Sequence, residues 1–159
     1  MKKLISAAAC ITAFAAAPAF AQSYVGAGVG AAKTDTNETS YKLYGGFQFN
    51  PTWGMEVAYN DLGRYRGADV DSWSIAGTGT VPLGTNWSLL GKLGATSNRP
   101  KFAGSSNKTD VLYGIGVGYS MTKNVGLRLE YEDFGTLSKS NNGNNSTGSN
   151  LGLSVKYTF

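Results

Sequence analysis

The sequence of 159 residues contains no histidine and only one cysteine, Cys10. Without histidine there is no Ser-His-Asp triad and no Cys/His zinc site. After residue 21 the chain has no cysteine either, so no disulfide framework holds it together. No catalytic residue, metal ligand or cofactor is therefore predicted.

Charge is also scarce and nearly balanced. Charged residues make up 15% of the chain, with 14 basic and 10 acidic side chains. Two of the basic residues, Lys2 and Lys3, lie in the first 21 residues, which leaves 12 basic against 10 acidic side chains after them. A net charge near +2 is not that of a nucleic-acid-binding domain, so no nucleic acid is expected as a partner.

The N-terminus has the pattern of a secretory signal peptide. Lys2 and Lys3 precede an uncharged, alanine-rich run, and "APAFA" places Ala19 and Ala21 in the small-x-small arrangement of a cleavage site. We predict a cleaved signal peptide over residues 1–21 and one domain over residues 22–159. The alternative is a lipoprotein acylated at Cys10, which is disfavoured because only six residues separate it from Lys3.

The stretch "SYVGAGVGAAKTD" contains Gly26-x-Gly28-x-x-Ala31, a loose match to a dinucleotide-binding loop. That loop needs a strand before it and a helix after it, because the helix N-terminus binds the pyrophosphate. Here apolar residues instead alternate with glycine at every second position, which is the period of a β-strand. "YGIGVGYS" repeats the same alternation. The nucleotide-binding interpretation is therefore rejected.

The same period of two runs through the rest of the chain and predicts eight strands. We expect them at residues 23–32, 40–50, 53–63, 71–81, 86–97, 109–120, 124–135 and 149–159. Glycine normally weakens strands. Its repeated use on one face indicates a narrow lumen, where glycine leaves room for large neighbouring side chains and for water.

Three features favour a membrane barrel over a secreted β-sandwich. Tight turns at 50–52, 82–85 and 121–123 alternate with longer polar segments near 33–39, 64–70, 98–108 and 136–148, as in outer-membrane barrels. Aromatic residues stand at the ends of the apolar faces, where they suit a membrane interface. Strands of about ten residues are long enough to cross the hydrocarbon layer when tilted. A sandwich explains the alternation but not the aromatic belts, so we predict an all-β, eight-stranded antiparallel up-and-down transmembrane β-barrel.

Three stretches resemble the OmpA-like transmembrane domain family. They are "YGGFQFNPTWGMEVAYNDLGRYRG" (44–67), "YGIGVGYSMTKNVGLRLEYEDFG" (113–135) and "LGLSVKYTF" (151–159). The resemblance implies a multi-pass protein of the Gram-negative outer membrane, surrounded by outer-membrane lipids, with its short turns in the periplasm. Phe159, preceded by Tyr157 and Val155, is similar to the signal by which the barrel-assembly machinery recognises its clients. Because the chain stops at Phe159, we expect no peptidoglycan-binding domain.

The family's lumen carries a gate of Glu, Arg, Lys and Glu. Glu56 and Arg128 occupy matching positions, whereas Thr78 and Gly118 stand at the other two. Only half of that gate is therefore expected here.

Alternation also places charged side chains on the inward faces of the strands. A basic residue facing the bilayer centre costs ~2–4 kcal/mol, so these residues must point into the lumen and pair there. We predict a network centred on Glu56 and Arg128, with Lys92, Glu130 and Lys156 around it. Alternation also puts Lys42 and Glu132 in the lumen, where they can lie above the membrane plane.

Two functions of different class follow. In the first, the protein contributes to envelope structure and contacts surface ligands through its loops, and the lumen charges only fill the barrel. In the second, it is a narrow, low-conductance pore whose selectivity those charges set. A lipid-modifying enzyme with a Ser/His pair is excluded by the absence of histidine, and ion pairing to Arg128 accounts for Glu130 and Glu132.

The longer loops are basic and predict a site for anionic lipopolysaccharide head groups or another surface ligand. The candidate residues are Arg64, Arg66, Arg99 and Lys101. The alternative is that these side chains only keep polar loops solvated.

Overall fold

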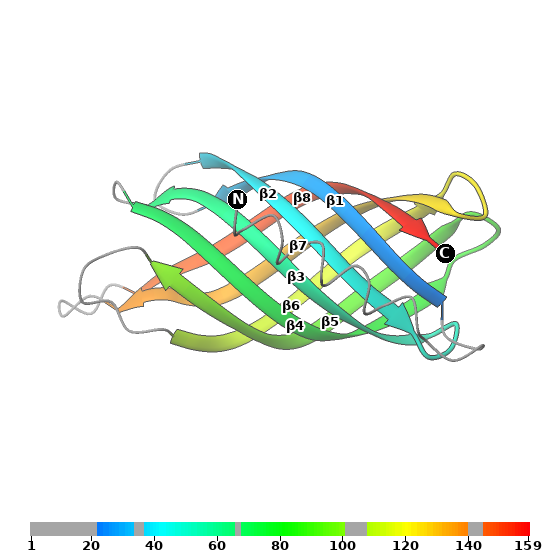
Figure 1. Cartoon of the computed structure of the whole chain (residues 1–159), viewed down its shortest axis with the longest axis horizontal. Helices are drawn as coiled ribbons and strands as arrows, with labels where there is room; N and C mark the ends of the chain where they lie inside the picture. Colours follow the sequence, from blue (N-terminus) through cyan, green and yellow to red (C-terminus); the bar gives the residue numbers. More distant parts are fainter. Residues whose placement is uncertain (1–21, 34–36, 66–67, 101–107, 140–144) are drawn as a thin grey trace, which may run out of the picture.

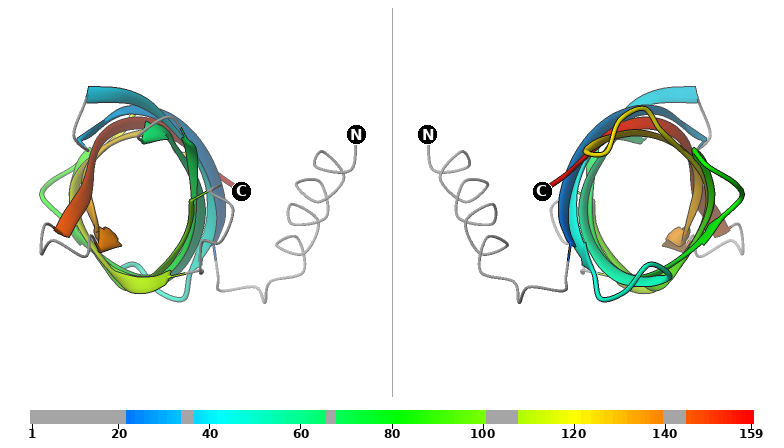
Figure 2. Two further views of the ribbon diagram at one scale, coloured as in Figure 1. Left: turned by 90° about the vertical axis from the view of Figure 1, so that its left-hand side faces the viewer. Right: turned by 90° about the vertical axis from the view of Figure 1, so that its right-hand side faces the viewer.

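The computed structural model describes residues 22–33, 37–65, 68–100, 108–139 and 145–159, and these form one closed antiparallel β-barrel (Figures 1 and 2). The strands follow one another in chain order and the last pairs with the first. Their bounds are β1 Gln22–Lys33, β2 Asn37–Gln48, β3 Trp53–Tyr65, β4 Ala68–Pro82, β5 Trp87–Pro100, β6 Lys108–Ser120, β7 Val125–Lys139 and β8 Asn145–Thr158. The predicted fold class is confirmed.

The strand pairing sets the tilt of the barrel. If one starts at Gln22 on β1 and moves from each residue to its partner on the next strand, the path returns to β1 at Ala32. This position is ten residues further along β1. This stagger means that the strands are strongly tilted, by about 35–45° in such barrels. Residues at the same height in the lumen therefore come from different depths of successive strands.

The two ends of the barrel differ. The turn end carries the connections 49–52, 83–86 and 121–124 together with Phe159, and the loop end carries the other four connections (Figure 1). Six of the described strands continue two to four residues further toward the loop end than the alternation predicted, and β1 and β6 continue one residue further. Residues such as 64–65, 98–100 and 136–139 therefore belong to strands rather than loops. No described helix is long and apolar enough to span a membrane.

The outer face of the barrel is apolar and ends in aromatic residues. Large side chains such as Leu93 and Ile115 are exposed there, at 66% and 57%. Near the turn end, Trp87 contacts Tyr119 at 4.9 Å between ring centroids, and near the loop end Tyr59 contacts Trp73 at 5.1 Å. Two aromatic belts at the ends of an apolar band are typical of a transmembrane barrel.

Inward glycines seat large polar side chains. A Cβ at Gly26 would collide with the Tyr44 ring, and one at Gly116 would lie 2.9 Å from Cγ of Glu130. At these two positions the glycines make room for neighbouring side chains, as expected, but that room holds a ring and a carboxylate rather than water.

Candidate functional site in the barrel lumen

The middle of the lumen contains six buried charged side chains, which we call the lumen network. The members are Lys42, Glu56, Lys92, Arg128, Glu130 and Glu132, each at most 8% exposed. They come from β2, β3, β5 and β7 and carry three positive and three negative charges. A buried charge needs a partner because desolvation costs several kcal/mol per ion. The network meets this need by balancing its own charge.

Arg128 joins two of the glutamates. Its Nη1 donates a hydrogen bond to Oε2 of Glu56 at 2.8 Å, and its Nη2 donates to Oε1 of Glu130 at 2.9 Å. Charge-assisted bonds of this length are among the strongest in proteins. Arg128 Nε has no hydrogen-bond partner among the described residues. One nitrogen of this buried side chain therefore makes no hydrogen bond with the described residues.

Two lysines complete the network. Lys92 Nζ lies 2.7 Å from Oε1 of Glu56, 2.7 Å from Oε1 of Glu130 and 3.1 Å from Oε1 of Glu132. Lys42 Nζ lies 2.8 Å from Oε1 of Glu132, 3.0 Å from Oε2 of Glu130 and 3.7 Å from Oε1 of Glu56. Each lysine therefore contacts all three glutamates.

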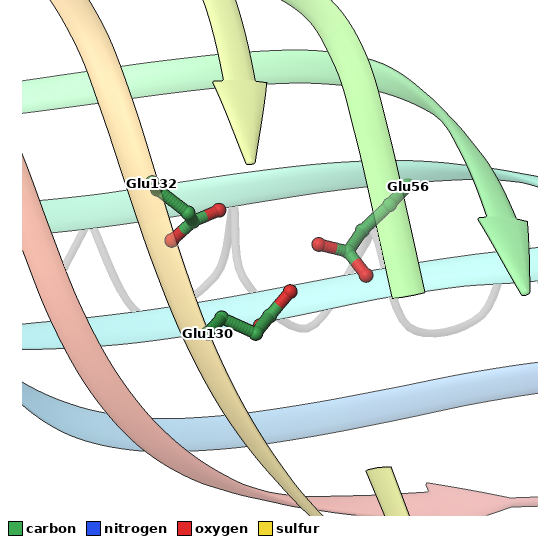
Figure 3. A group of neighbouring side chains, drawn as sticks. All are labelled: Glu56, Glu130 and Glu132. Atoms are coloured by element: carbon green, nitrogen blue, oxygen red, sulfur yellow. The ribbon is translucent and has the colours of Figure 1, made fainter. Parts of the chain in front are cut away.

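The three glutamates point toward one another inside the barrel (Figure 3). Glu56, Glu130 and Glu132 each offer a carboxylate oxygen, and these oxygens lie within 4.8 Å of one another. Such a group resembles a cation site in its chemistry. The ammonium groups of Lys42 and Lys92 already lie against these oxygens, so the protein supplies the cations itself.

Two inward tyrosines support the network. The Tyr24 hydroxyl donates to Oε2 of Glu56 at 3.2 Å, and the Tyr44 hydroxyl lies 3.1 Å from Oγ of Ser154. The Tyr44 ring has Lys42 Nζ 5.0 Å from its centroid and Arg128 Cζ 4.8 Å from it. Cations are attracted to the face of an aromatic ring. Tyr44 thus lies close to two like charges that both contact the same glutamates.

On the loop side of the network the lumen is closed by packed side chains. Phe134 is fully buried and Leu112 is 1% exposed, and both belong to one apolar cluster with Ala32 and Ala76. Buried polar side chains in the loop-end parts of other strands form short hydrogen bonds: Ser40 to Asn150 at 2.6 Å, and Ser72 with Thr96 at 2.6 Å. We call these residues the loop-end cap.

A β-bulge accompanies Phe134. The register of β7 with β8 shifts between Asp133 and Thr136, and Gly135 between them has a φ of 67°. Its backbone N–H donates to Oδ1 of Asp133 at 2.8 Å. A positive φ of this size favours glycine. The bulge lies directly beside the inward Phe134.

On the turn side of the network lies a cavity of about 50 Å³, which we call the turn-end cavity. Its lining includes Arg128 and Lys156 with the polar side chains Thr78, Ser88, Gln48 and Tyr24. A second, smaller cavity of about 10 Å³ lies on the other side, against Lys42, Glu130 and Glu132. The network thus borders both cavities.

The structure brings together most, but not all, of the residues predicted for the lumen site. Glu56, Arg128, Lys92 and Glu130 contact one another, whereas Lys156 is absent from every ion pair of the described residues. Its Nζ lies 5.3 Å from the centroid of the Tyr24 ring. Lys42 and Glu132, which were expected in the lumen but not in the central set, belong to the network. The ten-residue stagger, which alternation cannot reveal, places them at its level.

The two other gate positions lie on the turn side of the network. Thr78 is buried and lines the turn-end cavity, and so does Gly118. The carboxylates of Glu130 and Glu132 and the ammonium of Lys92 come from other positions on β5 and β7. The network is therefore built partly on residues outside the family pattern.

The remaining predicted residues lie at the two ends. The backbone of Arg64 and Arg99 belongs to the loop-end parts of β3 and β5, and Arg99 pairs with Asp71 in the strand register. Arg66 and Lys101 lie outside the described residues, as does the predicted signal peptide of residues 1–21. Phe159, Tyr157 and Val155 are exposed on the outer face, at 65%, 46% and 50%. Their role as an assembly signal stays a prediction.

Comparison with known proteins agrees with this architecture. The family model described as the outer membrane protein beta-barrel domain matches residues 6–159. The chain therefore belongs to this family of outer-membrane β-barrel proteins. No curated protein matches the sequence significantly.

Solved structures with the same fold include proteins of different roles. Neisserial surface protein A is 19% identical, with 89% of this chain and 98% of that chain covered and a TM-score of 0.59. Ail, the attachment invasion locus protein of Yersinia pestis, is 20% identical, with 87% and 97% covered and a TM-score of 0.57. The outer membrane enzyme PagL is 17% identical, with 84% and 98% covered and a TM-score of 0.61. At such identities the likeness concerns the fold alone.

Proposed function

We propose that this protein is a non-conducting, non-enzymatic barrel that contributes to outer-membrane structure and contacts surface ligands through its loops. The observation that carries the proposal is the lumen network, a buried and charge-balanced set of ion pairs between two separate cavities. An eight-stranded barrel is only just wide enough for its own side chains. Here those side chains fill the middle of the lumen, and the loop-end cap adds a second closed layer.

A narrow pore for ions or small solutes is the alternative, because the turn-end cavity already provides polar space on one side of the network. Single-channel current from the refolded protein in a planar bilayer separates the two. We expect no discrete steps from the wild type at moderate voltage. Discrete steps whose size or ion preference changes in Glu56→Gln and Arg128→Gln would make the protein a pore.

The absence of catalysis is part of the same proposal. A barrel of this fold is compatible with enzymatic activity, because PagL is an outer membrane enzyme. In this chain, however, there is no histidine to act as a general base, and three of its acidic residues are held in ion pairs inside the lumen. A test is hydrolysis of lipopolysaccharide acyl chains by the refolded barrel, for which we expect no product above a buffer control.

The loop end is the proposed binding surface, and anionic saccharides are the proposed ligands. Arg64 and Arg99 stand at that end of their strands, with Arg66 and Lys101 close to them in sequence. Guanidinium and ammonium groups form charge-assisted hydrogen bonds with phosphate and sulfate. The similar barrel Ail has been solved in complex with the heparin analogue sucrose octasulfate, which supports a polyanion as the ligand class.

Binding of lipopolysaccharide to the barrel in phospholipid nanodiscs tests this surface. Arg99→Gln combined with Lys101→Gln should weaken binding and reduce its dependence on salt, because two cationic contacts are lost. Lys123→Gln is the control for net charge, since Lys123 lies in the turn 121–124 at the opposite end and its replacement removes one positive charge against two in the loop-end variant. A loss in Lys123→Gln of half that of the double variant or more would show that only net charge matters and would refute a loop-end site.

A further inference from the structure

The turn-end cavity has a chemistry different from that of the rest of the lumen. Two cationic side chains line it, Arg128 and Lys156, and no carboxylate is among its described lining residues. The rest of the lining includes hydroxyl groups such as those of Thr78, Thr80 and Ser88. Hydroxyl and N–H groups can all donate hydrogen bonds. The cavity therefore combines positive charge and hydrogen-bond donors with the apolar side chains of Leu90 and Leu127.

The charge balance of the lumen leaves this cavity positive. The six residues of the lumen network carry three charges of each sign. Lys156 is a seventh charged side chain in the lumen. No described carboxylate lies within ion-pairing distance of its Nζ, which instead lies 5.3 Å from the centroid of the Tyr24 ring. An additional positive charge in a space of low dielectric needs a counter-ion or water.

A second, independent observation comes from Arg128. This side chain is 5% exposed, and its Nη1 and Nη2 are taken by Glu56 and Glu130. Its Nε has no hydrogen-bond partner among the described residues, although Arg128 lines the cavity. Buried donors are nearly always satisfied. Because this atom has almost no accessible surface, Arg128 contributes its positive charge to the cavity rather than a direct contact through Nε.

We propose that the turn-end cavity binds one small monovalent inorganic anion of the size of chloride, held by Lys156 Nζ and the hydroxyl groups of the lining, with the Arg128 guanidinium adding positive charge at the cavity wall. The volume of about 50 Å³ suits such an ion with a few waters, since one water needs roughly 10–15 Å³ of such space. The site lies on the periplasmic side in the orientation that the family resemblance implies. It does not depend on whether the barrel conducts.

The direct test is the line width of ³⁵Cl in chloride solutions of the refolded barrel, because exchange with a protein site broadens this signal. The wild type should show excess broadening that saturates with chloride concentration. Lys156→Gln should weaken the affinity about tenfold or more, while Lys156→Arg, which keeps the charge, should restore it. Thr78→Val keeps Lys156 and the side-chain shape, and should weaken binding to a smaller extent.

Lys123→Gln is the matched control, because it removes one positive charge from the exposed turn at the same end of the barrel. It should leave the broadening unchanged. Each variant is first shown to be folded by its resistance to unfolding in detergent. A wild type without saturable broadening would overturn the proposal, and so would equal broadening in the wild type and Lys156→Gln, or an equal loss in Lys123→Gln.

Discussion

The two halves of the lumen solve the problem of buried polar groups in opposite ways. Toward the loop end, Lys42, Lys92 and Glu132 form ion pairs within 3.1 Å. The buried side chains of Phe134 and Leu112 fill the lumen between these charges and the loop end. Toward the turn end, Lys156 has no carboxylate partner among the described residues and lies beside a cavity of about 50 Å³. The loop-end half therefore resembles a protein core built from paired charges, and the turn-end half resembles a polar vestibule. The same charge should therefore matter for stability in one half and hardly at all in the other.

Lys92→Met should produce the largest effect. It removes a cation that touches three buried glutamates, and breaking a buried pair costs about 3–5 kcal/mol. The free energy of unfolding in urea, measured in lipid vesicles, checks this. Adding Glu132→Gln restores the charge balance, so the double variant should lose less than the sum of the two single losses. Strict additivity would contradict a network.

Phe134→Ala should come next. The ring is fully buried in the loop-end cap, and a Phe→Ala cavity typically costs about 3 kcal/mol or more. The same vesicle assay measures the loss. Phe49→Ala, in the connection between β2 and β3, is a control for removal of an exposed Phe ring at the other end of the barrel. A negligible loss for Phe134→Ala would show that the cap is not packed.

The hydrogen bond between Ser72 and Thr96 should contribute less. Its length is 2.6 Å and both side chains are buried, so Thr96→Val leaves a buried hydroxyl without this partner and should cost about 1–2 kcal/mol. Replacing both residues, by Ser72→Ala and Thr96→Val, should recover part of that loss. No coupling in this double-mutant cycle would contradict the contact.

The smallest effect on the free energy of unfolding is expected for a substitution at the turn end. Lys156→Met should change the free energy of unfolding by less than about 0.5 kcal/mol, because no ion pair is broken and the side chain stands beside open space. Measured at low chloride concentration beside Lys92→Met, it compares the same substitution in the two halves. A loss as large as that of Lys92→Met would remove the distinction between core and vestibule.

Much of this structure follows from a period of two. Alternation places Glu56, Lys92 and Arg128 on the inner face. Phe134 and Leu112 have the same parity and also point inward, although the sequence analysis did not name them. Alternation does not determine the level along the barrel axis at which an inward residue lies. Lys42 on β2 meets Glu132 on β7 only because the strands are staggered by ten residues around the ring.

The boundaries were predicted less well for a related reason. Near the loop end the alternation predicts a loop for the polar residues 136–139, yet these residues pair with β8 after a bulge at Gly135. Backbone hydrogen bonds continue a strand without any apolar face. Likewise, Lys156 has the parity of a lumen residue, but its lack of a carboxylate partner depends on which strands lie beside β8. Such pairings are long-range and are not encoded in local alternation.

We propose that the lumen is closed between its two halves. It is tested most directly by the labelling of Ser88→Cys, since the chain has no cysteine after residue 21 and Ser88 lines the turn-end cavity. A small membrane-impermeant thiol reagent is added to one side at a time of vesicles with a known barrel orientation. A closed lumen predicts labelling from the turn side and none from the loop side. Labelling at similar rates from both sides would show a continuous water path through the network and would contradict it.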